Sequence, residues 1–465
     1  LIFNFKLLSI FLILFVGLLM YKNHDDFFYY HFPYTVSLIF EKKIIGIGLL
    51  EHGFRTPSSI FYLNSLFYLP YTDFYLLNLG AVLYMGFSNI FFLEKIFIQI
   101  KKRKVSLILF LSLVSLIFVN TAFYRLAEHG TDKSALILIF VLAILYLESL
   151  EKKMKLNFEQ IRNYYGTIIV LLLLIISLKS FYIIYLPILI LWMFQFDFFN
   201  HQIKNLKFLI FNSYTYLLVF GVLIFILTVF LNTGCAIYPA SFTCFPFLEW
   251  SIPKDQVMQM KNWYSLWSKA GATPDMRVDD PELYLSNFNW VSNWFNSYFF
   301  TKVSDFLLII FLISIISYFS LKNLKKKKQV NSNYKYLYMF IIVLFIEWFI
   351  NHPALRYGGY TLIALIIFIP LSQILNNYSE FNKKLKKTVL ILIFTSFGVF
   401  IVKNTIRINN EIVKYNYKPL TNPFFNIIDE AFYFNTLISR LESQRKNEDN
   451  RYYLILTQEL INSLN

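Results

Sequence analysis

Charged residues are scarce in this chain. Asp, Glu, Lys and Arg make up 15% of its residues, whereas hydrophobic residues make up 57% and aromatic residues 20%. A soluble globular domain typically has about 25% charged and about 45–50% apolar residues. The composition therefore excludes an ordinary soluble domain and indicates a polytopic membrane protein.

Two further absences narrow the function. Neither the P-loop pattern GxxxxGKS/T nor the dinucleotide pattern GxGxxG occurs, which disfavours chemistry driven by cytosolic ATP or a nucleotide sugar. Ionisable residues are also almost absent from the middle of the apolar segments. Transporters and proton pumps usually keep such residues near the bilayer midplane, so transport along a charged path is disfavoured as well.

The apolar residues form eleven segments near the length of about 20 residues that crosses a bilayer. They are 1–21, 74–100, 105–124, 134–150, 164–178, 181–199, 208–231, 303–321, 335–350, 359–375 and 388–403. The run 57–70 between two prolines predicts a re-entrant or interfacial helix. No small-x-small cleavage site follows the first segment, so we expect a retained anchor. The expected architecture is an all-α membrane bundle over 1–403, followed by a tail over 404–465.

Lysine and arginine are distributed unevenly between the loops. One set of loops holds 20 of them in 51 positions, and the opposite set holds 13 in 142 positions. The first set is 101–104, 151–163, 200–207, 322–335 and 376–387. The positive-inside bias places this set in the cytoplasm, and places the long loops 22–73 and 232–302 and the tail outside a bacterial inner membrane. The run Lys325–Lys328 is then a topology signal that contacts anionic lipids, which argues against a nucleic-acid partner.

The stretch between Asn23 and Ser59 concentrates polar residues beside the first apolar segment. It begins with Asp25 and Asp26, and a second group follows at Glu51, His52 and Arg55. Both groups should lie at one water–lipid boundary, because apolar segments flank them. The functional interpretation is a site on the external face. The alternative is a solvated loop with a surface helix over 34–43.

Two external turns carry more charge than a connection between helices requires. The first turn contains Arg125, Glu128, His129, Asp132 and Lys133. We interpret it as part of a site, with interfacial salt bridges among these neighbours as the alternative. Lys179, alone in a two-residue turn, is typical of a lysine that extends its amine to the membrane surface.

The second charged turn joins the segments 335–350 and 359–375. Arg356 lies there beside Gly358 and Gly359, where glycine lets the backbone approach closely and arginine suits a phosphate or carboxylate ligand. Alternatively, Arg356 pairs with Glu347 and stabilises the turn.

Cys235 and Cys244 are the only two cysteines, and both lie in the large external loop. Two thiols on the oxidising side predict a disulfide, with two free thiols as the alternative. Metal binding by this pair alone is disfavoured because no further cysteine or histidine lies nearby at zinc spacing. Several tryptophans follow in the same loop, which is typical of interfacial anchors and less often of platforms for sugar stacking.

The order of these features resembles the GT-C superfamily of membrane glycosyltransferases, which use polyprenyl-phosphate-linked sugars. A first helix precedes an external loop that begins with acids, here Asp25-Asp26, and a surface helix follows. The stretches YYHFPYTVSLIFEKKIIGIGLLEHGFRTPSSIFYLNSLF, EHGTDKSA, TGCAIYPASFTCF and RYGGY are similar to a group of uncharacterised bacterial multispanning proteins. This closer resemblance covers most of residues 24–365.

The resemblance implies transfer of a sugar from a lipid-linked donor to a cell-envelope glycan or lipid. Asp25 or Asp26 would be the catalytic carboxylate, and a general base of this kind has to reach the acceptor hydroxyl. Asp25 is favoured because it is nearer the first helix, and Asp26 would then cap the aromatic segment that follows. The cations Arg125, Lys133 and Arg356 would stabilise the departing phosphate. The remaining polar residues would position sugar hydroxyls or a Mg²⁺ or Mn²⁺ ion; these are Glu51, His52, Arg55, Glu128, His129 and Asp132. The alternatives are a lipid-linked glycan polymerase, ligase or flippase, and a non-catalytic assembly protein.

Overall fold

The computed structural model describes residues 2–464, with gaps. The gaps are residues 22, 25, 41–43, 73, 154–155, 197–210, 274–275, 325–333, 422, 424–437, 440, 444 and 446–450.

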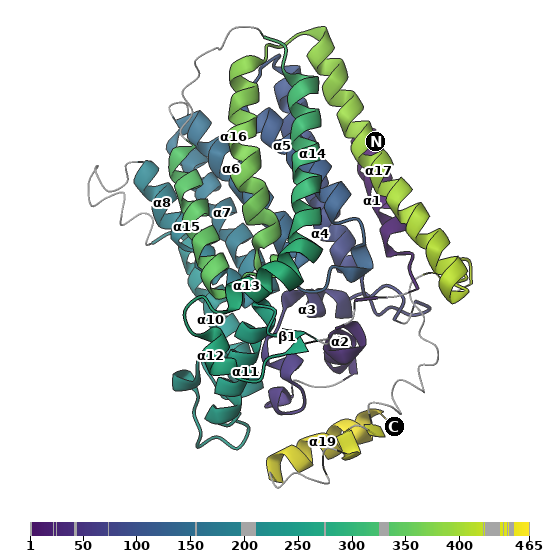
Figure 1. Ribbon diagram of the computed structural model, residues 1–465, viewed down its shortest axis with the longest axis vertical. Helices are drawn as coiled ribbons and strands as arrows, with labels where there is room; N and C mark the ends of the chain where they lie inside the picture. Colours follow the sequence, from purple (N-terminus) through teal and green to yellow (C-terminus); the bar gives the residue numbers. More distant parts are fainter. Residues whose placement is uncertain are drawn as a thin grey trace.

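The described residues form a helical bundle with one small β-hairpin. The hairpin pairs β1 (Ala272–Thr273) and β2 (Met276–Arg277) in antiparallel register. Figure 1 shows long helices side by side, with the shorter helices gathered at one end of the bundle. The helices of the bundle are α1 (Ile2–Phe15), α4 (Leu79–Lys101), α5 (Leu107–Ala122), α6 (Lys133–Lys152), α7 (Phe158–Leu178), α8 (Pro187–Gln195), α10 (Ser213–Thr233), α14 (Ser304–Leu321), α15 (Lys335–Asn351), α16 (Gly359–Tyr378) and α17 (Lys383–Tyr415). The helices at its end are α2 (Phe32–Phe40), α3 (Ser59–Ser65), α11 (Lys254–Ser268), α12 (Pro281–Leu285) and α13 (Trp290–Trp294).

The centre of the bundle is formed by α5 and α6. Both helices are apolar around nearly their whole circumference, which requires burial on all sides. Accordingly, α5 packs against α4, α6, α14, α16 and α17. α4 and α5 share a pair of polar contacts, in which the Asn89 and Asn120 amides donate to each other at 3.1 and 3.2 Å.

Helices lie at all eleven segments that the sequence predicts to be apolar spans. Among the described residues, seven helical segments are long and apolar enough to cross a membrane. One of them is Trp290–Leu321, in which α13, the π-helix η9 (Phe295–Val303) and α14 are continuous. The expected helical bundle, with helices that can span a membrane, is therefore confirmed. The larger count of about eleven spans stays a prediction, because helices such as α5 are shorter.

Described residues from loops of the two predicted sets lie at opposite ends of α16. At the C-terminal end of α16, Tyr378 O accepts a hydrogen bond from Leu324 N at 2.8 Å, directly before the lysine run. At the N-terminal end of α16 lies Arg356, in the short 3-10 helix η10 (Leu355–Tyr357). A helix of this length separates the two ends by about 30 Å. Which end faces outward stays a prediction from the positive-inside bias.

The C-terminal region extends the bundle beyond its predicted boundary at 403. Helix α17 continues to Tyr415, and Arg407 and Glu411 are buried within this extension as an ion pair of 3.3 Å. The last helix, α19 (Arg451–Leu464), lies across the end of the bundle that carries α2 and α11 (Figure 1). Its Tyr452 hydroxyl donates to Ile45 O at 3.0 Å.

Candidate functional site

Four segments far apart in the sequence bring charged side chains together at the N-terminal end of α16. Asp132 precedes α6, Lys179 follows α7, Arg356 lies in η10, and Asp26 precedes the π-helix η2 (Phe27–His31). Arg356 bridges the two acids: its Nε donates to Asp132 Oδ2 at 2.9 Å and its Nη2 to Asp26 Oδ2 at 3.3 Å. Lys179 Nζ donates to the other oxygen, Asp132 Oδ1. We call these four residues the ion network.

The two acids of the ion network differ in accessibility. Burial would raise the pKa of Asp132, but the adjacent charges of Lys179 and Arg356 reverse this, and its pKa lies below the usual range. Asp132 is therefore a fixed anion that holds the two cations. The Asp26 side chain is 28% exposed, against 9% for Asp132. Asp26 is thus the carboxylate of the network that an incoming molecule can reach.

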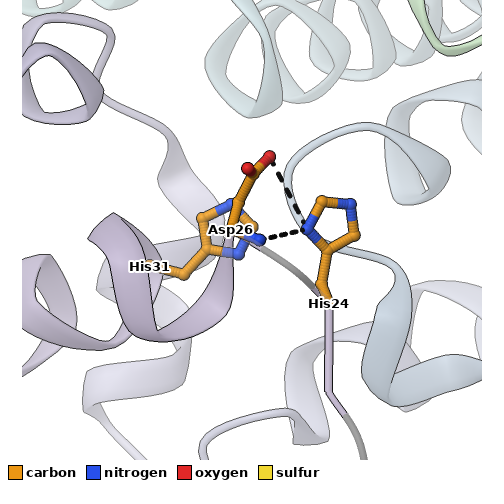
Figure 2. A group of neighbouring side chains, drawn as sticks. All are labelled: His24, Asp26 and His31. Atoms are coloured by element: carbon orange, nitrogen blue, oxygen red, sulfur yellow. Dashed lines mark hydrogen bonds and ion pairs between the residues drawn. The ribbon is translucent and has the colours of Figure 1, made fainter. Parts of the chain in front are cut away.

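Two histidines flank Asp26 (Figure 2). The Asp26 N–H donates to His24 Nδ1 at 3.0 Å, and the same nitrogen lies 3.6 Å from Asp26 Oδ2. The His31 ring stacks on the His24 ring at a centroid distance of 5.5 Å. Asp26 occupies the position before η2, but its side chain makes no capping hydrogen bond. The helix-capping role that its position suggests is therefore wrong, since its carboxylate faces Arg356 and His24.

Aromatic rings cover the cations of the ion network. The Trp267 ring, from α11, lies 5.0 Å from the Arg356 guanidinium carbon, and the Tyr357 ring lies 4.4 Å from Lys179 Nζ. The Trp267 and Tyr357 rings meet edge to face at 6.0 Å. The large loop thus lines one side of the site with Trp267. The sequence predicts that the tryptophans of this loop are mainly interfacial anchors.

The group at Glu51 lies beside the first acidic stretch, as the sequence predicts. The 3-10 helix η4 (His52–Arg55) packs against η2, and the Tyr29 hydroxyl lies 3.2 Å from His52 Nδ1. His52 Nδ1 also pairs with Glu51 Oε1 at 2.7 Å. Arg55 is buried and donates from Nε to Gly48 O at 2.9 Å. This group therefore supports the loop, and Arg55 stabilises it from within.

The turn before α6 contributes only Asp132 directly to the ion network. Arg125 Nη1 pairs with Glu128 Oε1 at 3.0 Å, so Arg125 and Arg356 have different carboxylate partners. His129 is buried, and its Nε2 lies 2.9 Å from Phe123 O. Lys133 has no ion pair among the described residues. Local salt bridging, the alternative interpretation of this turn, thus accounts for Arg125 and Glu128.

Several site residues differ from the sequence predictions. Lys179 is wrongly interpreted as an ordinary surface lysine, because it pairs with buried Asp132. Arg356 pairs with Asp132 and Asp26, while Glu347 accepts from Asn351 at 3.2 Å, so the suggested pairing of Arg356 with Glu347 is wrong. Asp25 lies outside the described residues. His24 and His31 are missed; their place in a stretch rich in acids is the one signal that could have identified them.

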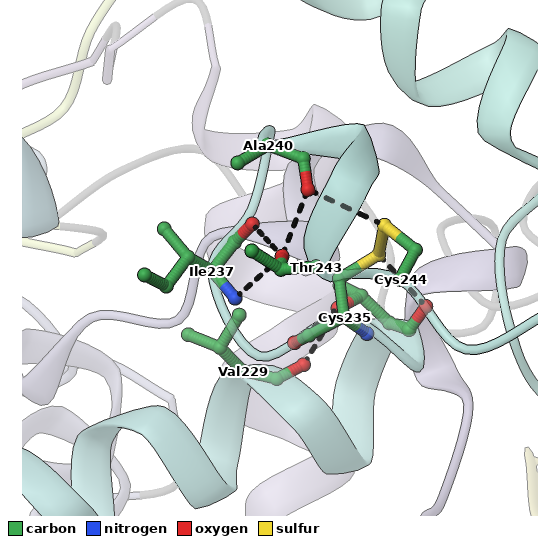
Figure 3. Close-up of a disulfide and its surroundings, with 7 residues drawn as sticks. Val229, Cys235, Ile237, Ala240, Thr243 and Cys244 are labelled. Carbon is green, nitrogen blue, oxygen red and sulfur yellow. Dashed lines mark hydrogen bonds between the residues drawn. A yellow bond between two sulfur atoms is a disulfide. The ribbon is translucent and has the colours of Figure 1, made fainter.

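A disulfide anchors the loop that supplies Trp267. Cys235 and Cys244 are bonded, and Thr243 between them donates its hydroxyl to Ile237 O and Ala240 O, each at 2.8 Å (Figure 3). Both cysteines belong to a small buried cluster with Val257 of α11. The disulfide thereby fixes the start of the loop against the helix that carries the tryptophan.

Thiol labelling tests the disulfide and the orientation together. In denatured membranes, a maleimide–polyethylene glycol should shift the native chain only after reduction, because both thiols are bonded. In spheroplasts, a membrane-impermeant maleimide should label Asp280→Cys, in the large loop, and should leave Lys384→Cys at the start of α17 unlabelled. A shift without reductant would remove the disulfide, and the reverse labelling pattern would invert the topology.

The buried His129 predicts a loss of stability in acid. Burial and, secondarily, the charge of Lys133 lower the pKa of His129 to about 3. The unfolded chain takes up this proton near pH 6.5, so the stabilising contribution is complete above about pH 6.5 and falls as the pH approaches 3. Between pH 7 and 5 the loss is about 2 kcal/mol. Thermal unfolding in detergent should show it, and His129→Gln should flatten the pH dependence; an unchanged slope would contradict the assignment.

Comparison with known proteins finds one family, and the matched range contains all four residues of the ion network. No curated protein and no solved structure matches the chain. Residues 1–363 match a family described as "Domain of unknown function (DUF8201)", and this range includes Asp26, Asp132, Lys179 and Arg356. The match covers more than half of the 465 residues. The chain therefore belongs to the DUF8201 family.

Proposed function

We propose that the protein is a GT-C-like membrane glycosyltransferase. It transfers a sugar from a polyprenyl-phosphate-linked donor to a cell-envelope glycan or lipid, on the external face of a bacterial inner membrane. The observation that carries the proposal is the pairing of the part-exposed Asp26 with Arg356, which is itself fixed by the buried Asp132. A reachable carboxylate and a preorganised cation are the two groups that this transfer requires.

The reaction can be written with the residues at hand. The hydroxyl oxygen of the acceptor bonds to the anomeric carbon of the sugar, and Asp26 accepts the proton that this hydroxyl loses. The bond from that carbon to the phosphate oxygen breaks, and the lipid phosphate leaves as an anion. Arg356 and Lys179, which the ion network holds in fixed positions, would stabilise this charge, because fixed cations act more strongly in a site shielded from water. Trp267 offers an aromatic ring to a sugar beside them.

A non-catalytic assembly protein is the second candidate, and one observation favours it. Arg356 already has two carboxylate partners, so the ion network also serves to tie four turns of the bundle together. Buried ion pairs of this kind fix a structure without performing chemistry. Substitutions distinguish the two candidates. A structural ion network must keep its charges paired for the protein to stay folded, whereas a catalyst must keep an accessible carboxylate for transfer.

Transfer can be tested directly with lipid-linked donors. The purified protein would be reconstituted in liposomes with polyprenyl-phosphate-linked hexoses and membrane extract as the source of acceptor. We expect time-dependent release of free polyprenyl phosphate, measured by mass spectrometry, that requires both the protein and the acceptor. Release that is equal in protein-free liposomes, for every donor tried, would contradict the proposed function.

A further inference from the structure

His24, Asp26 and His31 present three donor atoms to one small volume. The donor atoms, one from each side chain, all lie within 4.8 Å of one another, and Figure 2 shows the three side chains converging. Two donors bound to one ion at about 2.1 Å can be at most about 4 Å apart. His24 Nδ1 and Asp26 Oδ2, at 3.6 Å, already satisfy this limit, and a metal on Nδ1 would replace the hydrogen bond that this nitrogen accepts from Asp26 N–H. The third donor needs a movement of less than about 1 Å, which a small rotation of the imidazole supplies.

The environment of His31 provides a second, independent observation. His31 is only 6% exposed, and its Nε2 is a buried polar atom without a hydrogen-bond partner among the residues that the structure describes. An unpaired polar atom in such a position costs on the order of 1–3 kcal/mol unless a ligand satisfies it. Next to this ring, Gly130 has a φ of +54°, and a Cβ there would lie 3.0 Å from His31 Cε1. Glycine thus leaves space for the imidazole.

The ion network can release Asp26 to a metal without leaving a cation unpaired. Asp26 Oδ2 is the oxygen that Arg356 Nη2 contacts at 3.3 Å, so a metal at this oxygen would displace the contact. Arg356 would keep its shorter bond to Asp132 Oδ2, at 2.9 Å. Asp132 would therefore keep Arg356 next to the bound metal.

We propose that His24, Asp26 and His31 bind one divalent transition-metal ion. Two imidazoles and one carboxylate suit Zn²⁺, Mn²⁺, Fe²⁺ or Co²⁺, whereas Mg²⁺ prefers oxygen donors and retains its waters. Three protein ligands also leave coordination positions open, next to Arg356, for an anionic oxygen. The site is different from the Mg²⁺ or Mn²⁺ site expected from carboxylates such as Glu51 and Glu128, which pair with His52 and Arg125 instead. Binding of the ion does not depend on the proposed glycosyl transfer. In the metal-bound protein Asp26 Oδ1 would remain to accept the proton of the acceptor, and Arg356 would stay fixed by Asp132.

Co²⁺ provides a direct probe, because nitrogen and oxygen ligands give it a visible absorption spectrum that reports their number. The full-length protein, purified in detergent without a histidine tag, should bind one Co²⁺ per chain, and Zn²⁺ should displace it while millimolar Mg²⁺ should not. Zn²⁺ should also raise the apparent Tm. His24→Ala and Asp26→Asn should weaken Co²⁺ binding by more than the roughly 10–100-fold that loss of a supporting partner causes.

His52→Gln is the matched control. His52 and Glu51 form a second imidazole–carboxylate pair on the same face, but they offer only two donors. We expect His52→Gln to bind Co²⁺ like the native protein. An absent Co²⁺ spectrum in the native protein, or an unchanged one in His24→Ala, would overturn the proposal. Equal losses in His52→Gln and His24→Ala would do the same, by showing that the binding is not specific to the triad. Thermal unfolding of each variant without metal distinguishes loss of binding from loss of the fold.

Discussion

Asp26→Asn should lower the rate of glycosyl transfer by about 10²- to 10⁴-fold, the usual cost of removing a general base. Asparagine has nearly the same shape as aspartate but neither accepts a proton nor carries charge. Asp26 is the accessible acid of the ion network, whereas Asp132 is held by two cations. Release of polyprenyl phosphate in proteoliposomes measures the effect. The variant should remain in the membrane at normal abundance, because Arg356 keeps Asp132 as its partner.

Two further variants show whether the loss belongs to Asp26. Asp280→Asn is the matched control. Asp280 lies in the large loop 232–302, where its carboxylate caps α12 by accepting from Leu283 N at 3.0 Å, and asparagine caps equally well. It should retain the native rate. Asp25→Asn tests the adjacent acid, which the sequence favours because it is nearer the first helix. We expect the larger loss from Asp26. Near-native rates in both Asp25→Asn and Asp26→Asn would remove the acidic motif from the mechanism.

The helices were predictable because a long apolar run in a bilayer satisfies its backbone hydrogen bonds by forming a helix. The ends of the helices were harder to predict. The segment before 303 is rich in Asn, Ser and Trp and gives no apolar signal, yet α13 and η9 continue into α14 as one helix. In α17, Arg407 and Glu411 mark a helix end by charge, but they neutralise each other four residues apart and the helix continues to Tyr415. Local composition does not reveal such pairings in advance.

The candidate site was predictable where a single turn concentrates charge and not where the site depends on contacts between turns. Asp26, Asp132 and Arg356 stand out in their own segments. Lys179 acquires its role only because α6 and α7 pack together and place it against Asp132. His24 and His31 meet because the intervening chain turns at Asp26 into the π-helix η2, which no sequence period indicates. Trp267 reaches Arg356 from a loop more than eighty residues earlier in the chain.

Arg356→Gln should abolish transfer, with a loss of at least about 10²-fold, because the proposed phosphate charge loses its fixed guanidinium. The substitution also leaves Asp26 and Asp132 without their shared partner. Breaking a buried ion pair costs about 3–5 kcal/mol, and the 29% exposure of the Arg356 side chain places the cost at the lower end or below. Arg356→Lys keeps the charge but not the planar fork that reaches two carboxylates, so it should retain part of the activity. Transfer rate and membrane abundance are measured for both.

Arg277→Gln is the matched control, since the Arg277 guanidinium carbon lies 5.6 Å from the Trp263 ring on the same loop but has no place in the ion network. The transfer rate per unit of membrane-inserted protein then separates the catalyst from the structural tie. In Arg356→Gln, Asp132 keeps Lys179 as its partner, so part of the protein should remain folded and inserted. If the inserted protein transfers sugar at the native rate, Arg356 is only a structural partner of the two acids. If transfer stays lost in the inserted protein, the guanidinium is required for the reaction.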